Sequence, residues 1–136
     1  MKIKKIAVLT SGGDSPGMNT ALRAVVRTCA YNKIKCAGVH RGFEGLINNE
    51  IKELETRSVR GIINRGGTML YSARSEAFRS KSGRKKAYEN VIKNNIDAIV
   101  VIGGDGSFTG GMIFEKEFNI PIVGIPGTID NDLYGT

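Results

Sequence analysis

Three short apolar runs, each followed directly by a glycine-rich polar turn, constrain the fold of this 136-residue chain more than any other feature. The runs are Ile6–Leu9, Ala98–Ile102 and Ile122–Ile125. Short, unbroken apolar runs are typical of parallel strands that are buried on both faces. Apolar residues at helical spacing lie between them, from Met18 to Ala30 and over Phe108–Glu117. The sequence therefore predicts an α/β fold, a doubly wound parallel sheet in three layers.

The remaining segments give a coarser prediction. A further strand is expected at Lys35–Val39 and a further helix from about Arg84 to Asn94. Pro16 suits the first turn of a helix, so the helix after the first strand is expected to begin around Pro16–Met18. The segment from Arg41 to Gly67 is less regular, and only a short helix is expected there, at Val59–Asn64. The length of the chain allows one domain.

Composition and charge argue against several classes of protein. Two cysteines and one histidine give neither a disulfide framework nor a zinc site, so a reduced, cytoplasmic protein is expected. No apolar run approaches the roughly 20 residues that span a bilayer, so no membrane partner is expected. Lys and Arg number 20 against 13 Asp and Glu, and the net charge of +7 favours anionic partners. The basic run Arg79–Lys86 contains no aromatic residue for base stacking, so we interpret it as a solvated surface and expect no nucleic-acid partner.

Ligands of open parallel sheets bind at the carboxyl ends of the strands, where the three glycine-rich turns lie. These turns are Ser11–Gly17, Gly103–Ser107 and Pro126–Asp132, and they predict one composite site. Gly12 and Gly13 before a helix can point backbone N–H groups at an anion, although a plain strand-to-helix turn would look the same. The chain contains no Gly-Lys-Ser/Thr, which excludes a Walker A loop. Gly104 and Gly106 begin a G-x-G-x-x-G, but Thr109 stands where its last glycine would lie, so the dinucleotide-binding fingerprint is incomplete.

The acidic residues of the second and third turns suit phosphoryl transfer. Asp105 lies between two glycines, and one or two carboxylates together with substrate phosphates commonly hold Mg²⁺. The alternative is that Asp105 or Ser107 caps the following helix. Asp130 and Asp132 lie at i and i+2, and paired carboxylates can accept a proton from an attacking hydroxyl and orient substrate or metal. The alternative for this pair is an Asx-turn.

Three arginines are open to two interpretations from the residues alone. Arg23 and Arg27 lie at i and i+4 of one predicted helix, a like-charge pair that costs a few tenths of a kcal/mol unless it faces an anion. Their spacing alone favours simple exposure to solvent. Arg74 lies outside any apolar period and is equally open.

Four segments of the chain resemble one family. They are SGGDSPGMN (11–19), NRGGTMLYSAR (64–74), VVIGGDGS (100–107) and PGTIDND (126–132). Their order and spacing are similar to those of ATP-dependent 6-phosphofructokinase of the bacterial type, and they extend over essentially the whole chain. PGTIDND is highly specific to that family, whereas GGDGS also resembles turns of lipid and NAD kinases.

The resemblance implies phosphoryl transfer from MgATP to the 1-hydroxyl of fructose 6-phosphate, giving fructose 1,6-bisphosphate in glycolysis. Asp130 would be the general base, Thr128 and Asp132 would surround the transferred group, and Arg74 would neutralise its developing charge. Asp105 would bind Mg²⁺. The sugar substrate would contact Thr128, Ile129 and Asp130. The implied ATP pocket comprises Gly13, Phe43, Arg74, Ser75, Gly104, Asp105, Gly106 and Ser107. The implied site for ADP or another phosphorylated effector comprises Arg23, Arg27, Thr56, Arg57 and Arg60.

Individual positions refine what the resemblance implies. Pyrophosphate-using relatives typically place an aspartate at the position of Gly106 and a lysine at that of Gly127, so glycine at both positions implies ATP as the donor. Phe43 stands where many relatives have tyrosine, which keeps a ring for adenine stacking. Thr56 stands where some relatives have an effector-binding arginine, and Arg57 and Arg60 lie close by in the chain.

Members of this family run to well over twice the present length. Residues 1–136 would therefore be the N-terminal nucleotide-binding (ATP/Mg) domain of a Rossmann-like three-layer fold. This domain would be incomplete at its C-terminal end and would lack the substrate-binding second domain. The full-length enzyme is expected to be a cytoplasmic homotetramer. The fragment alone is expected to be inactive, because the groups that hold the sugar 6-phosphate belong to the missing part.

Two other functions stay open at this point. One is another kinase with a GGDG turn, of the NAD or lipid type, against which PGTIDND argues. The other is a non-catalytic, nucleotide-sensing fragment, which would bind ATP without transferring its phosphoryl group.

Overall fold

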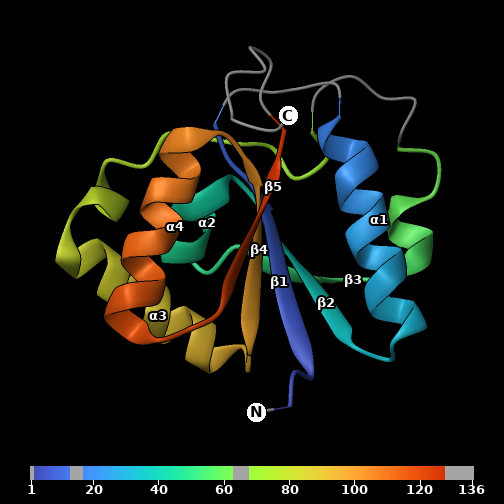
Figure 1. Cartoon of the computed structure of the whole chain (residues 1–136), viewed down its shortest axis with the longest axis horizontal. Coiled ribbons are helices and arrows are strands. Elements are labelled where there is room, and N and C mark those ends of the chain that lie inside the picture. Colours follow the sequence, from blue (N-terminus) through green and yellow to red (C-terminus); the bar gives the residue numbers. More distant parts are fainter. Residues whose placement is uncertain (1, 13–16, 63–67, 128–136) are drawn as a thin grey trace.

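The structure, a computed structural model, describes residues 2–12, 17–62 and 68–127. Within these residues five strands form one sheet in the order β3-β2-β1-β4-β5 (Figure 1). Their bounds are β1 (Lys5–Thr10), β2 (Lys35–Val39), β3 (Ile51–Leu54), β4 (Ala98–Gly103) and β5 (Ile122–Pro126). All neighbours pair in parallel except β3, which runs antiparallel to β2 at the edge. The predicted doubly wound sheet is therefore confirmed, with one antiparallel edge strand added.

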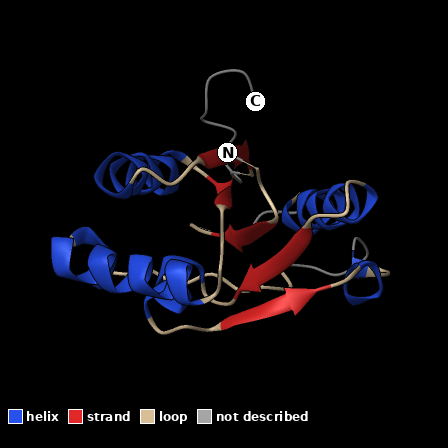
Figure 2. Ribbon diagram, turned by 90° about the horizontal axis from the view of Figure 1, so that it is seen from below, coloured by secondary structure: helices blue, strands red, loops and turns tan. Residues whose placement is uncertain are grey.

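Helices cover both faces of this sheet and make three layers (Figures 1 and 2). One face carries α1 (Met18–Tyr31) and the 3-10 helix η1 (Thr56–Val59). The other face carries α2 (Gly42–Ile47), the 3-10 helix η3 (Ala77–Arg79), α3 (Lys81–Lys93) and α4 (Asp105–Phe118). Among the residues that the structure describes, no helix combines the length and apolar character needed to span a bilayer.

Each face of the sheet has its own hydrophobic core, which explains the unbroken apolar runs. In β1, Val8 packs in the core with α1, while Ala7 and Leu9 pack in the core with the helices of the other face. All three side chains are fully buried. A strand that is covered on both sides needs an apolar side chain at every position.

The strand order places a switch point between β1 and β4. From β1 the chain adds β2 and β3 on one side, and it then adds β4 and β5 on the other side. The carboxyl ends of the strands at such a point form a crevice in which ligands bind. There the N–H of Ser11 donates to the carbonyl of Ile102 at 2.9 Å, and the N–H of Gly127 donates to that of Gly103 at 2.9 Å. Two of the three predicted turns therefore adjoin, and the third begins beside them.

Between Arg41 and Gly67 the chain is more regular than predicted, because it contains α2 and β3. The glycines that interrupt the pattern of α2 are required by packing: a Cβ on Gly45 would lie 1.5 Å from the carbonyl oxygen of His40. The helix expected at Val59–Asn64 is not continuous from Val59, although Ile62 is in a 3-10 conformation. The 3-10 helix η1 ends at Val59, and Gly61 has a positive φ of 74°, which no helix continues through. Ile63 and Asn64 lie outside the described residues.

Two predicted helices begin earlier than the apolar pattern indicated. α3 begins at Lys81, because the Oγ of Ser80 accepts a hydrogen bond from the N–H of Gly83 at 3.0 Å and caps the helix. α4 begins at Asp105, directly after the glycines of the turn. Both first turns are polar, so they carry no apolar periodicity.

Candidate functional site

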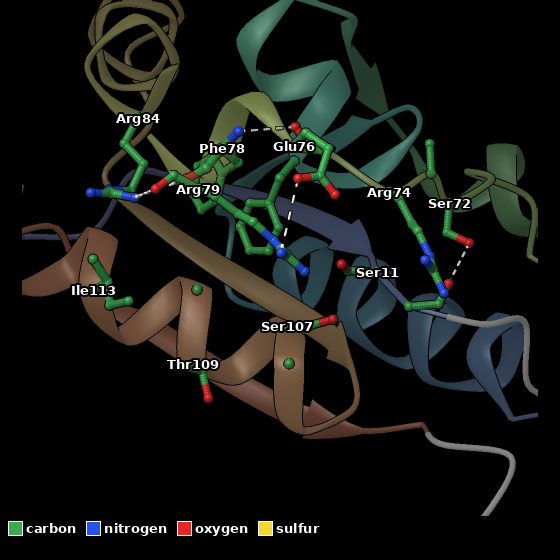
Figure 3. A pocket seen from close by; sticks show the side chains of 16 residues that line it. Ser11, Ser72, Arg74, Glu76, Phe78, Arg79, Arg84, Ser107, Thr109 and Ile113 are labelled. Carbon is green, nitrogen blue, oxygen red and sulfur yellow. Dashed lines mark hydrogen bonds and ion pairs between the residues drawn. The ribbon is translucent and has the colours of Figure 1, made fainter. Parts of the chain in front are cut away.

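A cleft of about 930 Å³ opens at the carboxyl edge of the sheet, beside the turns that follow β1 and β4 (Figure 3). One wall is the first half of α4, and the opposite wall is the segment that leads into η3. The lining residues are Ser11, Gly12, Phe43, Ser72, Ala73, Arg74, Ser75, Glu76, Phe78, Arg79, Arg84, Gly106, Ser107, Thr109, Gly110 and Ile113.

The first turn of α4 lines the cleft through Gly106 and Ser107. The N-cap of this helix is Gly104, and no side chain caps it. The alternative in which Asp105 or Ser107 is the capping residue is therefore wrong. The first N–H groups of a helix have no partner within it and carry a partial positive charge, so this turn can bind an anion.

The ends of β1 and β4 approach so closely that only glycine fits between them. A Cβ on Gly103 would lie 2.5 Å from the carbonyl oxygen of Ser11. Gly12 has a φ of +87°, in the left-handed region that favours glycine, and its Cβ would stand 3.6 Å from the Oγ of Ser107. At Gly106, by contrast, a Cβ would meet nothing within 4 Å. A side chain at position 106 would therefore extend into open space at the cleft.

Aromatic rings form one end of the cleft. The rings of Phe43 and Phe78 stack with centroids 4.1 Å apart and an interplanar angle of 15°. Both side chains are buried, and a Cβ on Gly110 would touch both rings at 3.6 to 3.8 Å. Ile113, which is half exposed, extends this apolar surface. A flat heterocycle could lie against this end of the cleft, while charged groups meet the end near α4's first turn.

Arg74 and Ser75 reach the cleft from residues 68–75, here named the crossing segment. It begins on the α1 face, where Leu70 packs in the core, and leads to η3, whose Phe78 packs in the core of the opposite face. The side chain of Ser72 is held by a hydrogen bond from its Oγ to the carbonyl oxygen of Gly12 at 2.7 Å. Figure 3 shows Arg74 beside Ser72, across the cleft from α4.

Arg84, on α3, links α4 and η3 in the wall of the cleft by hydrogen bonds. Its Nε and Nη2 donate to the two carboxylate oxygens of Glu117 at 2.6 and 3.0 Å. Its Nη1 donates to the carbonyl oxygens of Phe78 and Arg79 at 3.0 and 2.8 Å. The hydrogen bonds between Arg84 and Glu117 raise the pKa of Arg84 and lower the pKa of Glu117. The interpretation of the basic run as a solvated surface is therefore wrong for Arg84, although Lys81, Lys85 and Lys86 are exposed.

A second, smaller pocket of about 360 Å³ lies between α1 and the region of η1. Its lining residues are Arg23, Arg27, Thr56 and Arg60. The i, i+4 pair on α1 therefore shares a pocket with a third arginine, and no carboxylate lines it among the described residues. Arg57 is not part of the lining: its Nε lies 2.8 Å from Glu55 in an ion pair.

The remaining predicted residues lie at the rim or outside the described part of the chain. Gly104 and Asp105 directly precede the lining residues of α4, and Asp105 is exposed. Gly13, Thr128, Ile129, Asp130 and Asp132 lie outside the described residues. A single carboxylate beside a phosphate-binding turn fits Mg²⁺, which takes few protein ligands and keeps several waters. Within the described residues, no three acidic, histidine or cysteine side chains gather to hold a metal alone.

Several residues that line the cleft were not predicted, although the sequence held a signal for three of them. Thr109, Gly110 and Ile113 continue, at spacings of three and four residues, the face of α4 that begins at the predicted Gly106. Phe78 and Arg84 gave no such signal, because they reach the cleft only through contacts between η3, α3 and α4.

Comparisons with known proteins agree with this fold. The chain matches the family model described as phosphofructokinase over residues 5–136. It is 54% identical over 134 residues to ATP-dependent 6-phosphofructokinase 2 of Bacteroides thetaiotaomicron, and 58% identical over 135 residues to ATP-dependent 6-phosphofructokinase of Staphylococcus carnosus. Each match covers 98% of this chain and 41% or 42% of the relative, so the chain spans less than half of their length.

The solved structure of phosphofructokinase from Saccharomyces cerevisiae is similar in both sequence and fold. It is 43% identical, with a TM-score of 0.94 over 98% of this chain and 21% of that chain. The family match extends over nearly every residue of the chain. The chain belongs to the phosphofructokinase family.

Proposed function

We propose that this chain is the N-terminal, nucleotide-binding part of an ATP-dependent 6-phosphofructokinase. The enzyme transfers the γ-phosphoryl group of ATP to the 1-hydroxyl of fructose 6-phosphate. The observation that carries the proposal is the cleft at the switch point, where the first turn of α4, Arg74 and an aromatic surface meet, in a chain that matches the phosphofructokinase family over residues 5–136. Curated relatives that are 54% and 58% identical bear the name of this activity.

The proposed binding mode follows the polarity of the cleft. The adenine ring lies against Phe43 and Phe78, and the phosphates extend toward Gly106 and Ser107. Asp105 holds Mg²⁺, which neutralises phosphate charge when bound. The absence of a side chain at Gly106 leaves room for the α-phosphate, which favours ATP over pyrophosphate. Gly104, Ser75 and Gly13 complete the pocket in this proposal.

The proposed transfer is a single in-line displacement. Asp130 takes the proton from the sugar 1-hydroxyl, whose oxygen then bonds to the γ-phosphorus as the bond to the β–γ bridging oxygen breaks. Fructose 1,6-bisphosphate and ADP are the products. Arg74 neutralises the charge that develops on the transferred group, and Thr128 and Asp132 surround it. Ile129 contacts the sugar beside Thr128 and Asp130.

The second pocket is proposed to hold a phosphorylated effector such as ADP. Three guanidinium groups around about 360 Å³ suit a compact polyanion. Arg60 supplies the positive charge that Thr56 lacks, whereas Arg57 is engaged by Glu55 and does not contribute. Allosteric control, a homotetrameric assembly and a cytoplasmic location belong to the same proposal.

An activity assay on the full-length protein tests the proposal. ATP is offered with fructose 6-phosphate, NAD or diacylglycerol as acceptor, and phosphorylated products are measured. Phosphorylation of fructose 6-phosphate alone, lost in Asp130→Ala, is the expected result. Transfer to NAD or diacylglycerol would favour the other kinases, and ATP binding without transfer would favour a nucleotide sensor. Isolated residues 1–136 are expected to give no turnover.

A further inference from the structure

Three buried polar side chains outside the cleft hold the crossing segment by hydrogen bonds. We infer that Thr10, Asn19 and Thr68 are positioning residues that set where Arg74 stands over the nucleotide. This inference rests on the proposed function, because it assigns these residues a part in phosphoryl transfer. None of the three lines the cleft.

Asn19 joins two distant points of the backbone with one side chain. It lies in the first turn of α1 and is 1% exposed. Its Nδ2 donates to the carbonyl oxygen of Ile62 at 3.2 Å, and its Oδ1 accepts from the N–H of Met69 at 2.7 Å. The start of the crossing segment is therefore tied to α1 and to the residues that follow η1.

Two buried threonines make the next anchor. The Oγ1 of Thr68 donates to the Oγ1 of Thr10 at 3.0 Å and accepts from the N–H of Leu70 at 3.3 Å. The Oγ1 of Thr10 in turn donates to the carbonyl oxygen of Tyr71 at 3.0 Å. Each hydroxyl both donates and accepts, so this chain of bonds fastens the segment to the end of β1. A buried network of this kind is rigid only while every member is present.

The segment turns sharply between these anchors and Arg74. Tyr71 adopts a positive φ of 58°, which is uncommon for a residue with a Cβ, and its side chain is 65% exposed. Packing of the ring therefore does not enforce the turn. The bond from Thr10 to the Tyr71 carbonyl holds it, together with backbone bonds from the N–H of Tyr71 to the carbonyl of Thr68 at 3.2 Å and from the N–H of Arg41 to that of Leu70 at 2.9 Å. Leu70 is fully buried before the turn, and Ser72 is bonded to Gly12 after it. Arg74 follows two residues later, and its own side chain is exposed.

Loss of these hydrogen bonds is expected to displace Arg74 from its place in the transition state. Because Arg74 is exposed, the position of its guanidinium depends on the backbone that carries it. Displacement of a catalytic group by about 1 Å, caused by a change outside the site, can cost about 100-fold in rate. The loss is expected mainly in kcat, because charge on the transferred group develops only in the transition state.

The test compares Asn19→Leu and Thr68→Val with two matched controls in the full-length protein. Thr68→Ser keeps the hydroxyl. Asn90→Leu removes an amide that donates to the carbonyl oxygens of Leu46 and Ile47 at 2.8 and 2.9 Å, on the far side of the sheet from α1. Asn19→Leu and Thr68→Val are expected to lower kcat by about 100-fold with fructose 6-phosphate and ATP, with faster amide exchange over residues 68–75. Thr68→Ser and Asn90→Leu are expected to keep kcat and that exchange rate.

The possible outcomes separate this inference from the proposed function. A wild-type protein that phosphorylates no fructose 6-phosphate overturns the proposed function and the catalytic part of the inference. An active wild type whose kcat and amide exchange are unchanged in Thr68→Val overturns only the positioning role. Equal losses in Asn90→Leu and Asn19→Leu overturn it as well, since general loss of stability would then explain both. If Asn19→Leu does not fold, the Thr68→Val and Thr68→Ser pair decides.

Discussion

At the scale of single residues, the empty space above Gly106 has the most direct chemical consequence. In Gly106→Asp the new carboxylate extends into the cleft, where the proposed α-phosphate lies. We expect the KM for ATP to rise about 100-fold, because like charges brought together cost several kcal/mol. Steady-state kinetics with varied ATP provides the measurement.

Gly106→Ala is the matched control for this prediction. It adds a Cβ that meets no atom within 4 Å, so ATP binding is expected to stay near the wild-type value. Neither variant is expected to lower Tm, because alanine favours a helix over glycine and an acid suits its first turn. Equal KM values for the two variants would show that charge at position 106 does not determine donor choice.

The buried thiol of Cys36 predicts a dependence of stability on alkaline pH. Burial, followed by the neighbouring Cys29, raises the pKa of Cys36 from 9.0 to about 12. Below pH 9 the thiol is protonated in both states, so the free energy of unfolding is unaffected. Above pH 9 only the unfolded state loses the proton, so the free energy of unfolding falls as pH rises toward 12. The expected loss is about 1 kcal/mol between pH 9 and pH 10.

Urea denaturation at both pH values checks the prediction, with Cys36→Ala as the comparison. The variant is less stable at neutral pH because it leaves a cavity, but its stability should decline less steeply above pH 9. The same slope in wild type and variant would rule out Cys36 as the titrating group.

At the scale of elements, Arg84 and Glu117 join α3 and α4 at the back of the cleft. The bond to Arg84 lowers the pKa of Glu117 below its ordinary value of 4.5. The stability that this pair contributes is therefore present above pH 4.5 and is lost as pH falls through the lower, folded-state pKa. Glu117→Gln is expected to have a lower Tm than wild type at pH 7, and the difference should disappear under acidic conditions. Thermal unfolding of both proteins at pH 7 and at a pH below the folded-state pKa of Glu117 measures this difference in Tm. A difference in Tm that persists in acid would show that the ion pair is not its cause.

The second pocket, between α1 and η1, offers a comparison of two arginines. Arg60 lines the pocket, whereas Arg57 lies outside it in an ion pair with Glu55. Arg60→Ala is expected to weaken ADP binding at this site about tenfold, the value of a hydrogen bond to a charged group. Arg57→Ala is expected to leave the affinity for ADP at this site unchanged. Equilibrium binding to both variants measures the effect, and equal losses would show that only the overall positive charge matters.

The elements differ in how well the sequence predicts them. β4 is covered on both faces, so its apolar run was recognisable at once. α2 has six residues and contains glycines that packing requires, and β3 is half exposed, so neither has a periodic pattern. The same contrast holds in the cleft. Gly106 and Ser107 lie in a turn motif that is local in sequence, whereas Arg84 acquires its role from Glu117, which lies on a different helix.

At the scale of the whole molecule, the strand order explains why distant motifs act together. The switch between β1 and β4 brings the turns after both strands to one crevice, and the crossing segment passes over the same edge. Arginine side chains line both pockets: Arg74 lines the cleft, and three further arginines line the second pocket. The fold thus collects positive charge where phosphates are proposed to bind.

The most direct test of this account is the kcat of the full-length protein and of its Arg74→Ala variant with ATP and fructose 6-phosphate. The wild type is expected to form fructose 1,6-bisphosphate. Arg74→Ala is expected to lower kcat by about 100- to 1000-fold with little change in the KM for ATP, as for other groups that stabilise only the transition state. A wild-type protein without this activity, or a variant with an unchanged kcat, would contradict these expectations.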